Sequence, residues 1–154
     1  MRNSIYTTWP LYLSVVFLIL NDHLFKYVFP GLITGKLSDF AGIFLLVLVL
    51  RALHPRERVM ISMLVIASFT YWKSQYSQTL INLINSYSPL EIVRTVDYSD
   101  LVSFVMIPVA HYVYEQRDRY SINVRFAKLL KIPMILVTVI GITGTSVLLP
   151  HHKY

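Results

Sequence analysis

The sequence predicts an all-α fold, a polytopic bundle of about five transmembrane helices that forms a single domain over residues 1–154. Hydrophobic residues make up 55% of the chain and charged residues only 14%, whereas a soluble domain carries about a quarter charged residues. Apolar runs also recur at lengths near the roughly 20 residues that a helix needs to cross a bilayer. These proportions leave too little polar surface to cover a globule in water.

The five predicted spans follow the apolar runs of the chain. The first covers residues 10–29, from Pro10, which suits the first turn of a helix, to the residue before the helix-breaking pair Pro30-Gly31. Its start resembles a secretion signal, but no small-residue cleavage site follows, so we expect the segment to stay uncleaved. The remaining spans are expected over residues 37–53, 59–72, 100–114 and 132–149.

The basic residues predict the direction of the spans. Positive charges accumulate in the short cytoplasmic loops of membrane proteins. The short basic segments 51–58 and 117–131 should therefore lie inside, together with the N-terminus, and the C-terminus should lie outside. This layout places nine of the 14 Lys and Arg residues inside and five outside. Because the basic residues do not form one tract, they favour membrane lipids over nucleic acid as partners.

Two connecting segments have the spacing of an amphipathic surface helix. Residues 77–87 carry apolar side chains at helical intervals with polar residues between them, which predicts an interfacial helix on the outer side. Residues 122–131 show the same spacing with basic residues, which predicts a helix on the anionic cytoplasmic leaflet. Both helices would anchor the bundle to the membrane surface.

Three mixed clusters of acidic and basic residues lie near the predicted outer ends of the first, second and fourth spans. Asp22 would lie roughly 10 Å below the end of its span at 1.5 Å per residue, and an ionisable residue at such a depth is a functional candidate. One polar site shared by the three helix ends would explain all the clusters. The candidate ligand- or partner-binding residues are Asp22, His23, Lys26, Lys36, Asp39, Arg94, Asp97 and Asp100.

The charges of these candidates indicate two kinds of chemistry. Lys26, Lys36 and Arg94 suit an anionic group such as a phosphate or a carboxylate. The aspartates can balance these charges, bind a cation, or act as acid and base. A structural interpretation stays open, because Asp22 and Lys26 are i,i+4 neighbours that can neutralise each other, and Asp39 can cap a helix.

Two segments of this candidate site resemble a known family. Residues 36–44, Lys-Leu-Ser-Asp-Phe-Ala-Gly-Ile-Phe, and residues 94–102, Arg-Thr-Val-Asp-Tyr-Ser-Asp-Leu-Val, are similar to two helix starts of the VanZ-like family of small bacterial membrane proteins. Phe40 or Asp39 stands where that family has a histidine, and Ser103 or Phe104 stands near its asparagine. The resemblance implies a role in the cell envelope, since one member gives resistance to a glycopeptide antibiotic.

A second resemblance indicates an enzyme. Residues 18–27, Leu-Ile-Leu-Asn-Asp-His-Leu-Phe-Lys-Tyr, look like the opening segment of lipoprotein signal peptidase, a membrane aspartic protease of similar length. The two later motifs that supply the catalytic aspartates of that family are absent, although Asp97 and Asp100 lie in the corresponding region. This resemblance implies an aspartate-dependent hydrolase that acts on a lipid or a lipoprotein.

The sequence favours a non-enzymatic protective protein of the bacterial inner membrane. It would use the outer site to recognise an anionic envelope ligand or an incoming protein toxin, in a resistance or immunity role. The alternatives are the hydrolase and an accessory subunit of a larger membrane complex. No catalytic residue, metal ligand or cofactor is assigned, because the chain lacks cysteine, a phosphate loop and the common hydrolase motifs.

Overall fold

Five α-helices and several short helical turns make up the part of the chain that the structure describes. The structure is a computed structural model, and it describes residues 4–25, 28, 32–87 and 98–121. The α-helices are α1 (Trp9–Leu20), α3 (Leu32–Leu53), α4 (Arg58–Lys73), α5 (Gln78–Tyr87) and α6 (Met106–Glu115). Within the described residues there is no strand beyond an isolated bridge between Thr8 and Ser121. The predicted all-α class is therefore confirmed for this part of the chain.

The shorter helical segments join or extend these helices. Two 3₁₀ helices, η1 (Ile5–Thr7) and η3 (Gln75–Ser77), precede α1 and α5. A π-helical segment, η2 (Asn21–Phe25), follows α1, and the longer 3₁₀ helix η4 (Tyr98–Val105) leads into α6. The switch from η4 to α6 has a local cause in Pro108, which lacks an N–H and is tolerated only in the first turn of an α-helix. The regular helix accordingly begins at Met106.

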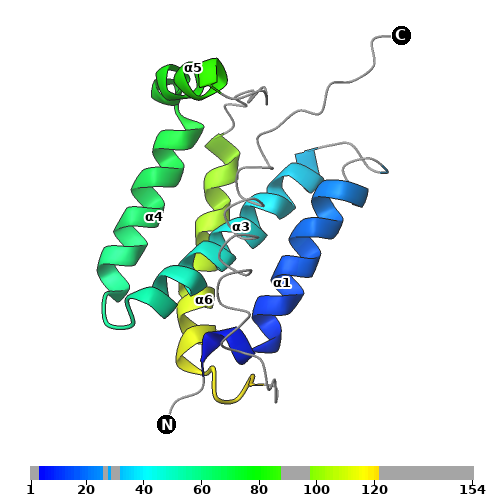
Figure 1. The fold of residues 1–154 in the computed structure, drawn as a ribbon, viewed down its shortest axis with the longest axis vertical. Coiled ribbons are helices and arrows are strands. Elements are labelled where there is room, and N and C mark those ends of the chain that lie inside the picture. Colours follow the sequence, from blue (N-terminus) through cyan, green and yellow to red (C-terminus); the bar gives the residue numbers. More distant parts are fainter. Residues whose placement is uncertain (1–3, 26–27, 29–31, 88–97, 122–154) are drawn as a thin grey trace.

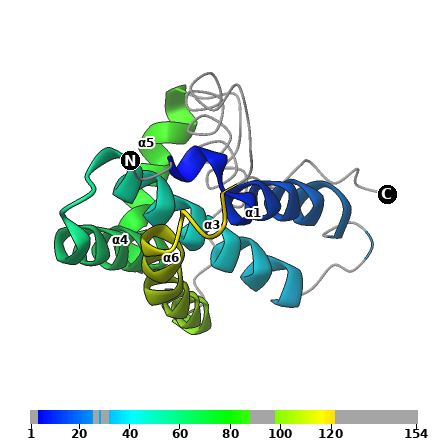
Figure 2. The same cartoon turned by 90° about the horizontal axis from the view of Figure 1, so that it is seen from below.

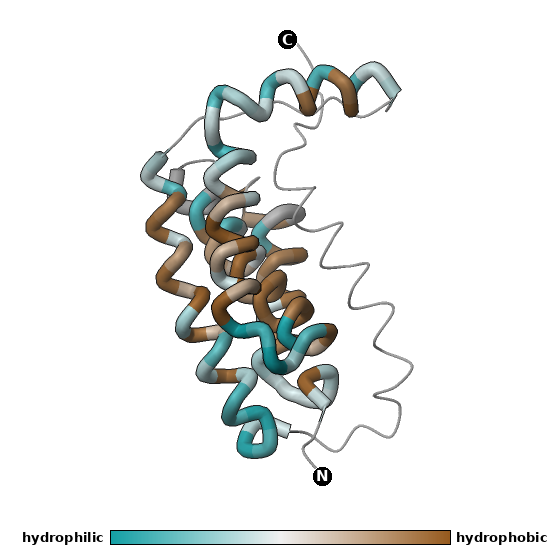
Figure 3. The backbone as a smooth tube through the Cα atoms, turned by 90° about the vertical axis from the view of Figure 1, so that its left-hand side faces the viewer, coloured by the Kyte–Doolittle hydropathy of each residue, from teal (hydrophilic) through white to brown (hydrophobic). Residues whose placement is uncertain are grey.

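Helix α3 lies at the centre of the molecule. It packs against α1, α4, α6 and η4, and Figures 1 and 2 show it between α1 on one side and α4 and α6 on the other. Leu45 and Leu48 of α3 are fully buried, as are Leu11 and Leu18 of α1. Apolar residues gather along the middle of these helices in Figure 3, with hydrophilic residues near their ends.

The structure corrects the predicted polytopic, multi-pass transmembrane fold. Among the residues that it describes, no helix is both long enough and apolar enough to cross a membrane. Helix α4 has 16 residues, roughly 24 Å at 1.5 Å per residue, against a bilayer core of roughly 30 Å. Helix α3 is longer, but it carries Lys36, Asp39 and Arg51. The predicted transmembrane bundle is therefore wrong. The assignment of its ends to the inside and the outside depended on the spans and is withdrawn as well.

The ends of the observed helices differ from those of the predicted spans. The helix expected over residues 10–29 begins at Trp9 but changes to η2 at Asn21. The segment expected over residues 100–114 is 3₁₀ up to Val105. A helix does form within residues 77–87, as α5. The segments predicted over residues 122–131 and 132–149 lie outside the described residues.

Candidate functional site

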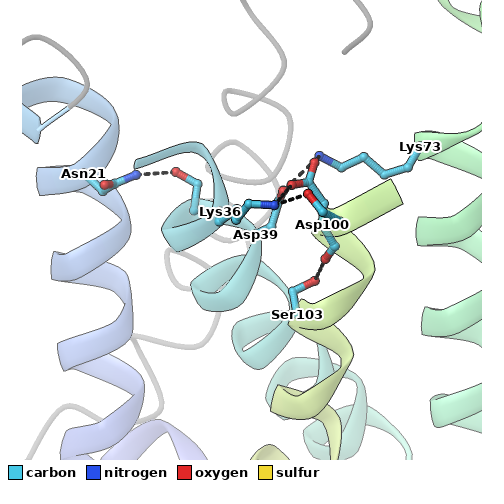
Figure 4. Close-up of polar contacts among 8 residues, drawn as sticks. Asn21, Lys36, Asp39, Lys73, Asp100 and Ser103 are labelled. Carbon is cyan, nitrogen blue, oxygen red and sulfur yellow. Dashed lines mark hydrogen bonds and ion pairs between the residues drawn. The ribbon is translucent and has the colours of Figure 1, made fainter. Parts of the chain in front are cut away.

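Two lysines and two aspartates from three parts of the chain meet at one end of the helices. Lys36 and Asp39 are three residues apart on α3, so their side chains share one face of that helix. Lys73 is the last residue of α4, and Asp100 lies in the first turn of η4. We refer to Lys36, Asp39, Lys73 and Asp100 as the lysine–aspartate cluster, which Figure 4 shows in close-up.

Lys73 joins the two aspartates. Its Nζ donates to Asp39 Oδ2 at 2.9 Å and to Asp100 Oδ2 at 2.6 Å. The other carboxylate oxygen of Asp100, Oδ1, lies 3.5 Å from Lys36 Nζ, which also contacts the Ser99 hydroxyl. Asp100 is therefore held by lysines from two different helices, and the formal charges of the four residues cancel.

Nearby polar groups fix the backbone that carries the cluster. The Ser103 hydroxyl donates to the Asp100 carbonyl at 2.6 Å, which supports the tight turn of η4. The Asn21 side-chain amide donates to the Ser38 hydroxyl, and both residues are buried between the end of α1 and the start of α3. The cluster itself thus lies on α3, α4 and η4, and Asn21 of η2 binds α3 beside it (Figure 4).

Burial and neighbouring charges change the acidity of the cluster. Burial raises the pKa of Asp39 to about 6; the Lys73 ammonium opposes this shift, and the charge and hydrogen bond of Asp100 add to it. Burial alone would lower the pKa of Lys73, but hydrogen bonds and charges from Asp100 and Asp39 raise that pKa above its usual value. Lys73 therefore stays cationic, while Asp39 can exchange a proton near neutral pH.

The cluster is buried on one side and accessible on the other. The Lys36 side chain is 30% exposed, whereas that of Lys73 is 14% exposed and both aspartates are buried. Lys36 is therefore the member that a ligand reaches first. Within the described part of the chain, no group of three or more His, Cys, Asp or Glu residues could hold a metal ion.

The structure brings together three of the eight predicted site residues, Lys36, Asp39 and Asp100. Asp22 and His23 lie in η2, and their side chains are outside the described residues. The structure describes neither the backbone nor the side chains of Lys26, Arg94 and Asp97.

Lys73 is the member of the lysine–aspartate cluster that the sequence prediction missed. The charge layout placed Lys73 on the same side as Lys36. Its position at the end of an apolar run was the other feature of the sequence that could have indicated a role in the cluster. A lone lysine after such a run is also an ordinary helix ending, because a cation there complements the helix dipole. Only the fold shows that Lys73 contacts both aspartates.

Comparisons of this chain with models of protein families, with curated proteins and with solved structures find no match. The similarity to the VanZ-like family stays a prediction from the two short segments that carry it.

Proposed function

We propose that this chain is a recognition protein with a protective, resistance- or immunity-type role. The lysine–aspartate cluster would be its binding site, and the ligand would present an anionic group. The source of that group is either a cell-envelope ligand or an incoming protein toxin. The location expected from the sequence, the bacterial inner membrane, stays a prediction that cell fractionation would test.

The convergence of four charged residues from α3, α4 and η4 carries this proposal. Taking charges out of water is costly, and apolar residues of similar volume often give equal or greater stability than a buried ion pair. The cluster is therefore a poor solution for stability alone. Desolvated ionisable groups with shifted pKa values gather at functional sites, and Asp39 is such a group.

Lys36 is the member that would contact the ligand. Its Nζ lies 3.5 Å from Asp100 Oδ1, against 2.6 Å from Lys73 Nζ to Asp100 Oδ2, so its internal ion pair is the looser one. A phosphate or carboxylate would form a shorter, charge-assisted hydrogen bond with this ammonium. Lys73 would then continue to neutralise both aspartates, which keeps the rest of the cluster intact.

Complementation of cells that lack the chain tests the protective role. The cells are challenged with a panel of envelope-active antibiotics and protein toxins, and they express the wild-type chain, Lys36→Gln or Arg56→Gln. Arg56 is an exposed cation in the α3–α4 turn and serves as the matched control. We expect the wild-type chain and Arg56→Gln to restore protection, and Lys36→Gln to lose most of it. Full protection by Lys36→Gln would reject the cluster as the binding site.

A second candidate function, a hydrolase that uses its aspartates on a lipid or lipoprotein, is supported by one observation. Asp39 and Asp100 bind the same Lys73 ammonium, and Asp100 contributes to the raised pKa of Asp39. Paired carboxyl groups that share a proton are typical of aspartate-dependent hydrolases. However, Lys73 binds an oxygen of each carboxylate, and its ammonium opposes the raised pKa of Asp39. Loss of lipoprotein turnover in Asp100→Asn with unchanged ligand binding would favour the hydrolase.

A further inference from the structure

A second group of polar residues, which includes two arginines, lies at the opposite end of the helices from the lysine–aspartate cluster. Arg51 is in the last turn of α3, and His111 and Tyr114 are in the second half of α6. Arg117 follows α6 in the next turn. We refer to Arg51, His111, Tyr114 and Arg117 as the arginine cluster; all four side chains are buried. Figure 1 shows the ends of α3 and α6 that carry it near η1 and the start of α4.

Both arginines contact the ring of Tyr114. The guanidinium carbon of Arg51 lies 4.6 Å from the centre of this ring, and that of Arg117 lies 4.5 Å from it. Each contact is a favourable cation–π interaction. Both side chains are also buried, and a buried charge is unfavourable unless an anion or hydrogen bonds compensate it.

The described part of the chain supplies no such anion to Arg51. One of its terminal nitrogens, Nη1, donates to the Pro55 carbonyl, and its Nε is buried without a hydrogen-bond partner. No carboxylate there forms an ion pair with this guanidinium: Glu115, one turn from His111, pairs with Arg58 at 3.2 Å on the surface instead. Residues 122–154 contain neither aspartate nor glutamate. Arg51 is only 6% exposed, and the burial of a charge is costly when no described residue supplies an acidic partner.

His111 adds a further polar group beside the arginines. It is 2% exposed; its Nε2 is 2.9 Å from the Ser62 hydroxyl, and its Nδ1 has no hydrogen-bond partner among the described residues. Burial first, and then the charges of Arg51 and Arg58, lower the pKa of His111. Both burial and the charge of Arg51 therefore favour the neutral form of this imidazole.

We propose that the arginine cluster is a second binding site, specific for a phosphate group, in which Arg51 and Arg117 are the principal ligands. Guanidinium groups present several donors in a planar fork that matches phosphate and carboxylate oxygens. Two guanidinium groups around one ring carry two positive charges, which favours a dianionic phosphate over a single carboxylate. Such an anion would supply a counter-charge to Arg51 and a partner for its Nε.

The competing explanation is purely structural. The Nη1 atoms of Arg51 and Arg117 donate to the carbonyls of Pro55 and Tyr114, and a cation after the end of a helix is favourable without any ligand. The two explanations differ in one observable property, because only a binding site gives a saturable response to phosphate.

Titration of the purified full-length chain with inorganic phosphate tests the proposal. Calorimetry and thermal unfolding are followed at constant ionic strength, with chloride as the reference anion. We expect saturable heat and a melting temperature that rises with phosphate concentration, because a ligand that binds only the folded state stabilises it. Arg51→Gln should weaken binding by about tenfold or more, and Arg51→Lys should also weaken it because an ammonium cannot bind in a bidentate way. Arg56→Gln in the same turn should bind like the wild type.

The same titration with glycerol 3-phosphate identifies the source of the phosphate group. Tighter binding of this monoester than of inorganic phosphate supports an organic phosphate as the ligand, and equal or weaker binding supports the free ion. Absence of a saturable response in the wild-type chain would overturn the proposal, and this result does not depend on whether Arg51→Gln folds. Equal weakening by Arg51→Gln and Arg56→Gln would also overturn it, since binding would then follow net charge alone.

Discussion

Lys73 donates to Asp39 and Asp100 from the last turn of α4, while Lys36 binds Asp100 from the more exposed side. Replacement of Lys73 by Met leaves two buried carboxylates without their shared cation. We therefore expect Lys73→Met to lower the free energy of unfolding by about 3–5 kcal/mol, as for other broken buried ion pairs. The matched change Lys36→Met should cost about 1 kcal/mol or less, because that pair is more solvated.

Denaturation of both variants in urea measures this difference. Similar losses for Lys73→Met and Lys36→Met would contradict the central position of Lys73 in the cluster.

The pKa of Asp39 makes stability depend on pH in a defined direction. In the folded chain this pKa is about 6, above the usual 3.8, so the folded state binds the proton more tightly than the unfolded state. The contribution of Asp39 to stability is therefore full below about pH 4 and declines as the pH rises to about 6. Asp39→Asn should remove a decline on the order of 2–3 kcal/mol between pH 4 and pH 7.

Urea denaturation at a series of pH values checks this effect. Glu57→Gln, which removes an exposed carboxylate, is the matched control and should keep the wild-type profile. If Asp39→Asn also keeps the wild-type profile, the carboxyl group is not in the desolvated environment that the structure shows.

At the level of elements, the part-buried hydrogen bond between Ser62 and His111 links α4 to α6, in addition to the exposed Arg58–Glu115 ion pair. The Ser62 hydroxyl lies 2.9 Å from His111 Nε2 and 3.1 Å from the Arg58 carbonyl in its own helix. Removal of the hydroxyl leaves the buried imidazole nitrogen without its partner, which costs about 1–3 kcal/mol. Ser62→Ala should therefore be clearly destabilising in urea denaturation.

Ser68→Ala provides the control on the same helix. Among the described residues, the Ser68 hydroxyl is bonded only to backbone carbonyls of its own helix, those of Leu64 and Val65. Its loss should change the free energy of unfolding by about 0.5 kcal/mol or less, as for other surface substitutions. Equal effects of the two substitutions would show that the α4–α6 contact does not form.

Prediction of the elements succeeded where local signals act alone. Pro10 marks the start of α1 to within one residue, and the amphipathic spacing of residues 77–87 indicates α5. The predictions failed where tertiary contacts or backbone chemistry intervene. Asn21 donates a hydrogen bond to Ser38 at the point where α1 ends and η2 begins. Pro108 limits α6 to the residues from Met106 onward. Hydropathy reports neither effect.

At the scale of the whole molecule, composition predicted the helical class correctly and the transmembrane arrangement wrongly. An apolar residue contributes to hydropathy wherever it lies, and the chain places large apolar side chains on outward faces as well as in its core. Leu13, Val59 and Met63 are exposed, while Leu45 and Leu48 are fully buried. A hydropathy window therefore counts apolar residues but gives no information on the length of the helix that carries them.

Part of the candidate site was predictable from the sequence. Lys36, Asp39 and Asp100 were identified because acids and bases occur together near helix ends. Their meeting with Lys73 depends on the packing of α4 and η4 against α3, which no local pattern encodes. The arginine cluster was also not predicted, because its two arginines were interpreted only as positive charges of cytoplasmic loops.

A double-mutant cycle between Lys73 and Asp100 tests the central claim, that α4 and η4 bring their charges to one cluster. The free energies of unfolding are measured for the wild type, Lys73→Met, Asp100→Asn and the double variant. The contact at 2.6 Å predicts an interaction energy of at least about 1 kcal/mol, because neighbouring residues in one ionic network do not act additively. Losses that add to within about 0.5 kcal/mol would show that the two residues are far apart, and would contradict the site on which the proposed function rests.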